Sequence, residues 1–397
     1  MQVLLYLLRS GLALALAIAA ACGSGSAAHE QPAARWYRAV VSSGTTQVPF
    51  LVELPTRANG KAHFRSGSYA FEADATVAGD IVRVEMPIYN SVLVAASTAE
   101  GIAGTFQLYT PFDGNISLKL SAKPVAGPDL VNLRDEAPRG KALDLGSSAY
   151  FRVEFDSKVA GKLSLSRVGE GAYDAELLLE NGSVSYLGGV GDGNRLVLSG
   201  FDGTAAFQLD ITFLAGFQEG RGTWHAGQKL DWHERVTLRK TPDFEIQMNI
   251  EVTELAMPEL APFAGKPLLV EFGASWCSTC REVAPALHEI YDQFHAQGLE
   301  VVTVLYEFSN DAAYDRQQAE KFKRAYNVPW VVMPITSEPG EKLPAGVGAS
   351  AFPLLVVVGR DGKATAVRAG FPMDVNSTAY RSATAQLRSS VEAVVKH

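Results

Sequence analysis

The hydrophobic residues of this chain change their period near Lys240, and that change divides it into two kinds of structure. Before Lys240, short runs of alternating apolar and polar residues repeat many times, separated by Gly, Asn and Asp. Period-two alternation is typical of strands with one buried face, so we predict an antiparallel β domain of unknown role over residues 36–240. Examples of these runs are Phe151, Val153 and Phe155, then Leu163 and Leu165, then Phe207, Leu209, Ile211 and Phe213.

Turn sequences between the runs support hairpins, because Gly accepts a positive φ there. The turns predicted in this way are Asn59-Gly60, Asp113-Gly114, Asn181-Gly182 and Asp202-Gly203. Two parts of the β region also resemble each other weakly in sequence, and we call this similarity the sequence echo. Either a duplicated β unit or chance matches between Gly-rich hairpins would explain it. Its first copy is Ile81–Val84, Ile88–Asn90 and Gly104–Phe106, and its second is Leu196–Leu198, Phe201–Gly203 and Gly222–Trp224.

Two Trp-His pairs, Trp224-His225 and Trp232-His233, stand out in the β region. We interpret them as two adjacent strands with aromatic residues on one face and histidines on the other. We see no catalytic constellation in this half of the chain.

After Lys240, strands alternate with helices, which implies an α/β layer fold with parallel pairing at its centre. We predict a linker over residues 241–257 and the α/β domain over residues 258–397. The predicted strands are 268–272, 301–305 and 354–358, and the predicted helices are 283–294, 312–326 and 380–394.

We predict an export signal over residues 1–21, because the apolar stretch Leu12–Ala21 follows Arg9. This stretch has about half of the roughly 20 apolar residues that a helix needs to span a membrane. Cleavage before Cys22 would leave a lipid-modified cysteine, and Ala19–Gly23 resembles a bacterial lipobox. Cleavage after Ala28 is the alternative. Residues 22–35 have the composition of a flexible tether.

If Cys22 carries lipid, Cys277 and Cys280 are the remaining thiols among the three cysteines of the chain. A disulfide that closes so short a loop gains little from loop entropy, so scaffolding explains it poorly. A structural zinc site needs four ligands, and no second Cys pair or paired His follows. Export to an oxidising compartment therefore favours redox chemistry.

The cysteines stand in Trp276-Cys277-Ser278-Thr279-Cys280, between a predicted strand and a predicted helix. The N-terminus of a helix favours a thiolate, so Cys277 is predicted to be the attacking sulfur. Cys280, one turn later and more buried, is predicted to resolve the mixed disulfide.

Residues from about Pro258 to the C-terminus resemble a thioredoxin-fold domain of the TlpA-like class of membrane-anchored thiol-disulfide proteins. The resemblance implies that Glu271 is the buried carboxylate, that Pro285 kinks the active-site helix, and that the Phe352-Pro353 bond is cis. It also implies that Asp311–Pro334 is the helix and strand that this class inserts. We expect Glu271 to have a raised pKa and to relay the Cys280 proton, Pro353 to pair with substrate, and Trp276 to shield the disulfide.

The combined prediction is a multidomain protein, an all-β N-terminal domain followed by a thioredoxin-like α/β domain, in the bacterial cell envelope on the periplasmic side. We expect a lipid-anchored thiol-disulfide oxidoreductase that exchanges with protein thiols and disulfides and receives electrons from a membrane donor. Glu271 and the absence of Pro between the cysteines favour a reductase or isomerase. The alternative is an envelope binding or assembly protein whose thioredoxin-like half is a redox-poised docking module; a peroxidase of related fold is a third hypothesis, less favoured because no Thr/Pro-rich loop with a nearby Arg is visible.

Composition narrows the partners further. The formal net charge is -8, and no run of Lys and Arg offers a surface for phosphate, so we expect no nucleic-acid partner. We expect no cofactor and no metal.

Overall fold

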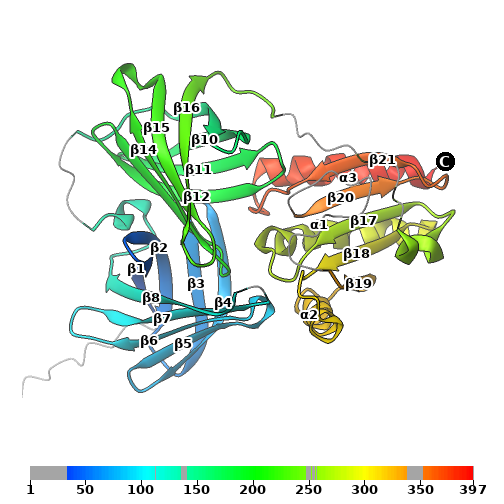
Figure 1. The fold of residues 1–397 in the computed structure, drawn as a ribbon, viewed down its shortest axis with the longest axis horizontal. Coiled ribbons are helices and arrows are strands. Elements are labelled where there is room, and N and C mark those ends of the chain that lie inside the picture. Colours follow the sequence, from blue (N-terminus) through cyan, green and yellow to red (C-terminus); the bar gives the residue numbers. More distant parts are fainter. Residues whose placement is uncertain are drawn as a thin grey trace, which may run out of the picture. The chain divides into compact units, whose positions relative to one another are not determined.

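The alternating strands of the N-terminal region close into two antiparallel barrels, β1 to β8 and β9 to β16 (Figure 1). The computed structural model describes residues 34–396 except 112, 136–140, 247–251, 253–254, 256 and 338–351. In each barrel every strand pairs with its neighbour in sequence, and the last strand pairs with the first. Closure leaves neither barrel with a free sheet edge along its strands.

The first barrel follows directly from its period-two sequence. Strand β4 (Tyr69–Ala78), for example, buries every second side chain along most of its length, and those side chains fill the barrel interior. The other strands are β1 (Ala34–Ser43), β2 (Thr46–Pro55), β3 (Asn59–Ser66), β5 (Ile81–Met86), β6 (Ser91–Ser97), β7 (Ile102–Thr110) and β8 (Gly114–Pro124). The short 3-10 helix η1 (Pro87–Tyr89) connects β5 to β6, and η2 (Leu130–Leu133) follows β8.

The second barrel repeats this plan around a core that includes Phe151, Leu163, Leu198 and Phe213. Its strands are β9 (Ser148–Phe155), β10 (Ala160–Gly169), β11 (Ala172–Leu179), β12 (Val184–Asp192), β13 (Arg195–Phe201), β14 (Ala206–Phe213), β15 (Glu219–Ala226) and β16 (Trp232–Thr241). The 3-10 helix η3 (Ala215–Phe217) lies between β14 and β15.

The predicted all-β region is confirmed, and it contains two barrels where we expected one domain. The two copies of the sequence echo fall on the fifth and seventh strands of each barrel, β5 and β7 in the first and β13 and β15 in the second. This equivalence favours duplication over chance matches. The predicted limits of the β domain, the linker and the C-terminal domain stay predictions.

Three of the four predicted turns have Gly in the left-handed region, at Gly114, Gly182 and Gly203. The prediction for Asn59-Gly60 is wrong, because the chain bends before Asn59 and both residues belong to β3. His225 and His233 lie opposite each other on β15 and β16. Trp224 is buried, whereas Trp232 is 54% exposed, so only one of the two tryptophans contributes to the core.

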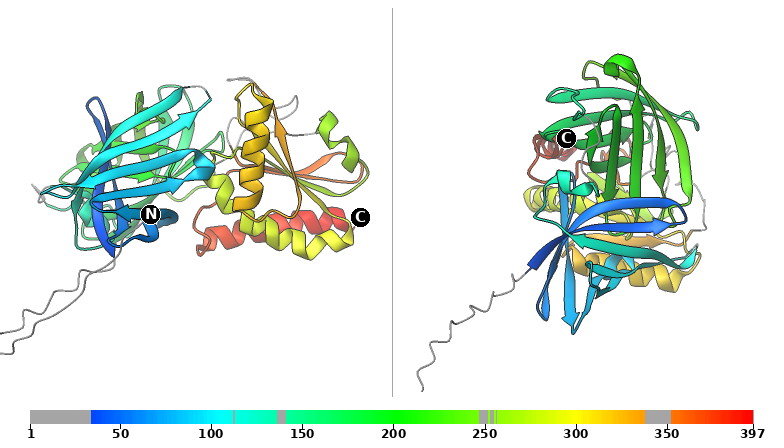
Figure 2. Two further views of the ribbon diagram at one scale, coloured as in Figure 1. Left: turned by 90° about the horizontal axis from the view of Figure 1, so that it is seen from below. Right: turned by 90° about the vertical axis from the view of Figure 1, so that its left-hand side faces the viewer.

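The C-terminal region is a mixed five-stranded sheet in the order β19-β18-β17-β20-β21 (Figure 1). Helices accompany this sheet (Figure 2). Strands β17, β18 and β19 are parallel, while β20 is antiparallel to β17 and to β21. The predicted parallel pairing therefore holds on one side of β17 only. The strands are β17 (Leu268–Gly273), β18 (Glu300–Tyr306), β19 (Val331–Ile335), β20 (Leu354–Val358) and β21 (Ala364–Ala369). The α-helices are α1 (Ser278–Phe294), α2 (Ala312–Ala325) and α3 (Thr378–Val395). The 3-10 helices are η4 (Pro258–Phe263) and η5 (His295–Gln297).

Side chains alternate along β17 between two apolar clusters. Leu269 packs with residues of all three helices, whereas Val270 and Phe272 pack with η4 on the other face. Glu271 has the parity of Leu269, so it points toward the helices. Within the described residues, no helix is long and apolar enough to cross a membrane.

Candidate active site

Cys277 and Cys280 form a disulfide with a Cα–Cα distance of 5.3 Å, where the loop after β17 enters α1. Cys277 is the N-cap residue of α1, and its Sγ accepts a hydrogen bond from the Cys280 N–H at 3.0 Å. Unpaired N–H groups and the helix dipole at this position stabilise a thiolate. The arrangement suits Cys277 for the attacking role.

The two sulfurs differ in access, because Cys277 is 8% exposed and Cys280 is fully buried. They pack in a small apolar cluster with Ala274, Trp276 and Phe352. The rings of Trp276 and Phe352 lie 6.1 Å apart. Cys277 is therefore the more accessible of the two sulfurs.

The peptide bond between Phe352 and Pro353 is cis, as the resemblance implied. Pro353 is buried directly before β20, and its carbonyl oxygen accepts a hydrogen bond from the Gly370 N–H at 2.8 Å. Phe352, its neighbour, belongs to the apolar cluster around the cysteines. The predicted Pro353 therefore directly follows a residue that packs with the cysteines.

Glu271 lies on β17 with only 1% of its surface exposed. Its Oε2 accepts a hydrogen bond from the Thr303 hydroxyl at 2.7 Å, and the Trp330 indole N–H donates to the same hydroxyl oxygen at 2.9 Å. Its Oε1 has no hydrogen-bond partner within the described residues. Burial raises the pKa of Glu271 to about 7, so the carboxyl can exchange a proton near neutral pH.

Gly273 provides the space between this carboxyl and the buried sulfur. A Cβ atom at Gly273 would lie 3.0 Å from Cys280 Sγ and 3.8 Å from Glu271 Oε1. The unpartnered oxygen and the resolving sulfur therefore border the same small space. The sequence analysis did not identify Gly273, although a Gly at the end of a predicted strand is a signal of close approach.

A second buried carboxylate, Glu307, holds the loop that leads to Cys277. Its Oε1 accepts from the Ser275 N–H at 2.7 Å, and its Oε2 accepts from the Ser275 hydroxyl at 2.9 Å. The Gln318 amide donates to the same hydroxyl at 2.8 Å. Burial raises the pKa of Glu307 to about 7. The sequence analysis missed Glu307; the available signal was its place directly after β18, which ends at the same sheet edge as the parallel β17.

The remaining predicted site residues are more distant or outside the described residues. Pro285 lies inside α1 with an exposed side chain. Cys22, predicted to carry a lipid, and the stretch around it that resembles a lipobox fall outside the described residues. Among the described residues, no group of three or more His, Cys, Asp or Glu is placed to hold a metal ion.

The first barrel reaches the active site as well. A cavity of about 220 Å³ borders Trp276 and is lined by aromatic residues of the barrel and of α2. Its aromatic lining residues besides Trp276 are Tyr89, Tyr109 and Tyr314. The Arg281 guanidinium on α1 lies 5.0 Å from the centre of the Phe71 ring, in cation–π contact.

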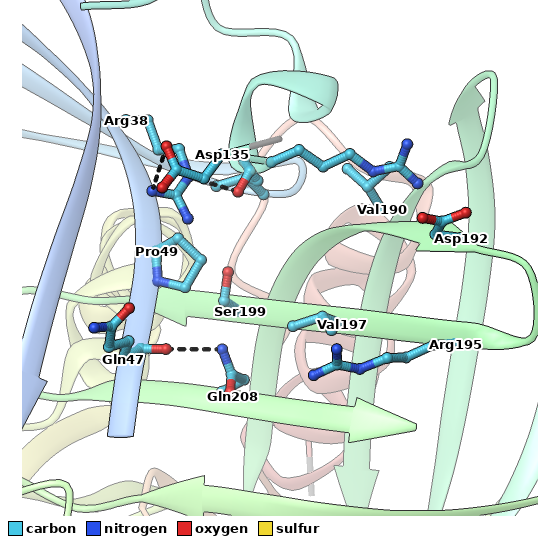
Figure 3. A pocket seen from close by; sticks show the side chains of 12 residues that line it. Arg38, Gln47, Pro49, Asp135, Val190, Asp192, Arg195, Val197, Ser199 and Gln208 are labelled. Carbon is cyan, nitrogen blue, oxygen red and sulfur yellow. Dashed lines mark hydrogen bonds and ion pairs between the residues drawn. The ribbon is translucent and has the colours of Figure 1, made fainter. Parts of the chain in front are cut away.

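Another cavity, of about 450 Å³, lies between the two barrels and has several arginines in its wall (Figure 3). The Arg38 Nε donates to the Leu133 carbonyl at 2.7 Å, and Arg195 pairs with Asp210. The Gln208 amide donates to the Gln47 carbonyl at 2.9 Å. These contacts hold the side chains of Arg38, Arg195 and Gln208 in place, and the lining contains no cysteine.

The C-terminal region is similar in sequence to known proteins. A protein family described as thioredoxin-like matches residues 265–364. The thiol-disulfide oxidoreductase ResA of Bacillus thuringiensis is 25% identical over 117 residues, which are 29% of this chain and 62% of that protein. Tryparedoxin of Trypanosoma brucei brucei is 27% identical over 104 residues, covering 26% of this chain and 67% of its own length.

Among solved structures, a putative thiol:disulfide interchange protein DsbE from Chlorobium tepidum is 22% identical, with a TM-score of 0.28, and covers 39% of this chain and 94% of its own. The chain spans between about a fifth and two thirds of the length of the curated relatives it matches. The predicted enzyme class agrees with the names of these relatives. The C-terminal region of this chain is therefore similar to thioredoxin-like proteins and to thiol-disulfide oxidoreductases.

Proposed function

We propose that this protein is a thiol-disulfide oxidoreductase that exchanges the Cys277–Cys280 pair with thiols and disulfides of other proteins, and that it acts as a reductase or isomerase. The observation that carries the proposal is the Cys277–Cys280 disulfide at the start of α1, backed by the buried and unpartnered oxygen of Glu271. The names of the relatives support the same chemistry.

In the first step, the reduced protein attacks a substrate disulfide. The Cys277 thiolate forms a bond to one substrate sulfur, the substrate disulfide breaks, and the other substrate sulfur leaves as a thiolate that takes a proton from water. The N-terminus of α1 supports this step because it favours the charged form of Cys277.

In the second step, Cys280 releases the substrate. The Cys280 thiol gives its proton to Glu271 Oε1, and the resulting thiolate attacks Cys277 Sγ. The mixed disulfide breaks, and the second substrate sulfur leaves as a thiolate. The substrate has then gained two electrons, and the protein holds the Cys277–Cys280 disulfide. A dithiol donor must reduce that disulfide before the next cycle.

Pro353 and Trp276 have supporting roles in this proposal. The backbone beside Pro353 lies next to the cluster that contains the sulfurs, where an extended substrate segment can pair with it. The Trp276 ring covers the disulfide from the side of the barrel cavity and limits its exposure to water.

We place the protein in the bacterial cell envelope, on the periplasmic side, with Cys22 as its lipid anchor and a membrane protein as its electron donor. The export-signal pattern before Cys22 supports this location. Replacing Cys22 by Ala should release the protein from envelope membranes or block its processing, because several acyl chains hold a protein firmly where one does not. A wild-type protein found wholly in the soluble exported fraction would exclude the anchor.

Insulin reduction by the full-length chain tests the proposed activity. With dithiothreitol as donor, we expect the wild-type protein to accelerate precipitation of the insulin B chain and the Cys277→Ser variant to be inactive. If the wild type is no faster than dithiothreitol alone, the thioredoxin-like region is a docking module and the proposal is wrong. A reduction potential below about -200 mV would support the reductase direction, whereas a value near about -120 mV would mark an oxidant.

A further inference from the structure

Equivalent turns of the two barrels meet beside the active-site helix. The turn between β5 and β6 contains η1, and the corresponding turn between β13 and β14 contains Asp202 and Gly203. The Ser91 hydroxyl donates to the Gly203 carbonyl at 2.7 Å, and a Cβ atom at Gly203 would lie 3.1 Å from Met86 Sδ. We call residues 87–91 and 202–205 the paired turns.

The paired turns contact the residues that surround the cysteines. The hydroxyl of Ser278, which stands between Cys277 and Cys280, donates to Asp202 Oδ2 at 2.8 Å. From the other turn, the Tyr89 ring lies 5.8 Å from the Arg281 guanidinium. The barrels therefore supply part of the environment of the dithiol.

Hydrogen bonds within its own turn hold the Asp202 carboxylate in place, independently of Ser278. Its Oδ1 accepts three hydrogen bonds of 2.8 Å from its own turn, donated by the Thr204 N–H, the Thr204 hydroxyl and the Ala205 N–H. Asp202 is only 9% exposed, and within the described residues no Lys or Arg forms an ion pair with it. Its second oxygen, Oδ2, is thus held toward α1, and no cation neutralises the charge of the carboxylate within the described residues.

The nearest cation on α1 is already engaged. Arg281 Nε donates to Glu282 Oε1 at 2.7 Å, and the guanidinium is in contact with the rings of Tyr69, Phe71 and Tyr89. The Glu282 carboxylate offsets the positive charge of Arg281. Arg281 therefore does not cancel the negative charge that Asp202 places near the start of α1.

We propose that Asp202 is a positioning residue of the dithiol site, supplied by the second barrel, and that it makes the Cys277–Cys280 pair more reducing. Two effects act in the same direction. The Ser278 hydroxyl hydrogen is committed to Asp202, so it cannot stabilise the Cys277 thiolate. The carboxylate also places a negative charge near that thiolate and opposes the helix dipole.

The sign of the effect follows from which redox state holds the thiolate. A stabilised thiolate stabilises the reduced form and makes the pair a stronger oxidant. Asp202 destabilises the thiolate, so it shifts the equilibrium toward the disulfide and makes the dithiol a better electron donor. This inference rests on the proposed function and explains why a barrel would be joined to a reductase.

The test is the equilibrium of the full-length protein with a series of glutathione buffers, read as the fraction of alkylatable Cys277 and Cys280. Asp202→Asn removes the charge but keeps a carbonyl oxygen for the bonds of the turn. We expect its equilibrium constant for reduction to rise about five- to tenfold, where tenfold corresponds to about 30 mV. Asp202→Glu, which restores the charge, should return toward the wild-type value.

The matched control is Asp210→Asn on β14 of the same barrel, where the carboxylate pairs with Arg195. We expect the equilibrium constant for reduction of this variant to equal that of the wild type. Equal constants for wild type, Asp202→Asn and Asp210→Asn would overturn the inference. If Asp202→Asn does not fold, Asp202→Ser replaces it, because it removes the charge and its hydroxyl oxygen keeps an acceptor for the turn. A rise in the equilibrium constant then supports the inference, while no shift overturns it. A wild-type pair that fails to exchange with glutathione at all would instead contradict the proposed function.

Discussion

The barrels and the thioredoxin-like region bury polar groups in different ways. Among the described residues of the barrels, the buried polar side chains are five hydroxyl groups and one carboxylate, at Asp202. The C-terminal region buries the carboxyl groups of Glu271, Glu307 and Asp315, together with the amide of Gln318. A buried carboxylate is costly unless it is paired or protonated.

This difference locates the chemistry. Buried carboxyl groups are concentrated around β17, β18 and the loop that leads to Cys277, where they can move a proton or hold a backbone group. The barrels are otherwise ordinary apolar cores, and their one buried carboxylate is the group that contacts Ser278. Replacing single carboxyl groups distinguishes an action on the cysteines from a role in stability alone.

The largest effect is expected for Glu271→Gln in the insulin assay. Glu271 accepts the Cys280 proton only when it is ionised, so the wild-type rate should fall as the pH drops below about 7. The variant should be slower at pH 8 by about a hundredfold, within the usual range for general acid–base catalysis, and should lose this pH step. Glu307→Gln is the control and should keep the step. A Glu271→Gln rate equal to that of the wild type would remove Glu271 from the mechanism.

The second prediction concerns stability and pH. Glu271 and Glu307 have folded pKa values of about 7, above the ordinary value of 4.5, so the folded state retains protons that the unfolded state has released. Their contribution is complete below pH 4.5 and is lost as the pH rises through about 7. For each group the loss is on the order of 3 kcal/mol.

Hydrogen exchange of β18 amides, corrected for intrinsic rates, measures this loss. The oxidised wild-type protein should show lower protection at pH 8 than at pH 4.5, and Glu307→Gln should show a smaller difference. Strands of the first barrel serve as the internal reference, because burial raises the pKa of Asp174 and Glu176 on β11 of the second barrel. An equal loss of protection in the first barrel would break the contrast between the two regions.

The third prediction concerns the space over Gly273. Gly273→Ala adds a methyl group 3.0 Å from Cys280 Sγ, so the oxidised protein should lose about 2 kcal/mol of stability, as is common for overpacked cores. Gly127→Ala in the first half of the chain is the matched control, because a Cβ atom there would have no neighbour within 4 Å. Urea unfolding of both variants makes the comparison. Similar stabilities would show that the space around Cys280 is looser than described.

The smallest effect is expected where the first barrel contacts α2. The Asn90 amide donates to the Tyr314 hydroxyl at 3.0 Å, so Tyr314→Phe should cost about 1 kcal/mol or less. Tyr109→Phe is the control, because Tyr109 is 42% exposed and lies beside Tyr314. Unfolding midpoints that are the same for both variants would mean that this barrel contact adds no stability.

Local sequence patterns predicted the elements of the C-terminal region well. The strand before Cys277, the helix after it and the final helix all lie where the hydrophobic period placed them. Glu271 and Pro353 came from the resemblance to a family. The structure buries both and makes the bond before Pro353 cis, and their roles stay predictions. The helices and strands were predictable because each depends on residues close together in the chain.

Features that depend on distant segments were not predicted. Period two indicates strands but not which strand pairs with which, so the closure of β1 on β8 and of β9 on β16 was missed. Asp202 lies 76 positions before its partner Ser278, and Glu307 lies 32 positions after Ser275. No local pattern links residues at such separations.

Trapping of partners by Cys280→Ser in producing cells tests the central claim most directly, that Cys277 exchanges with the sulfurs of other proteins. Without the resolving sulfur, mixed disulfides cannot be released, so alkylated cell extracts should contain adducts of Cys277 with other proteins that disappear on reduction. Cys277→Ser should form none. If Cys280→Ser accumulates no adduct beyond the level of Cys277→Ser, the exchange mechanism is contradicted.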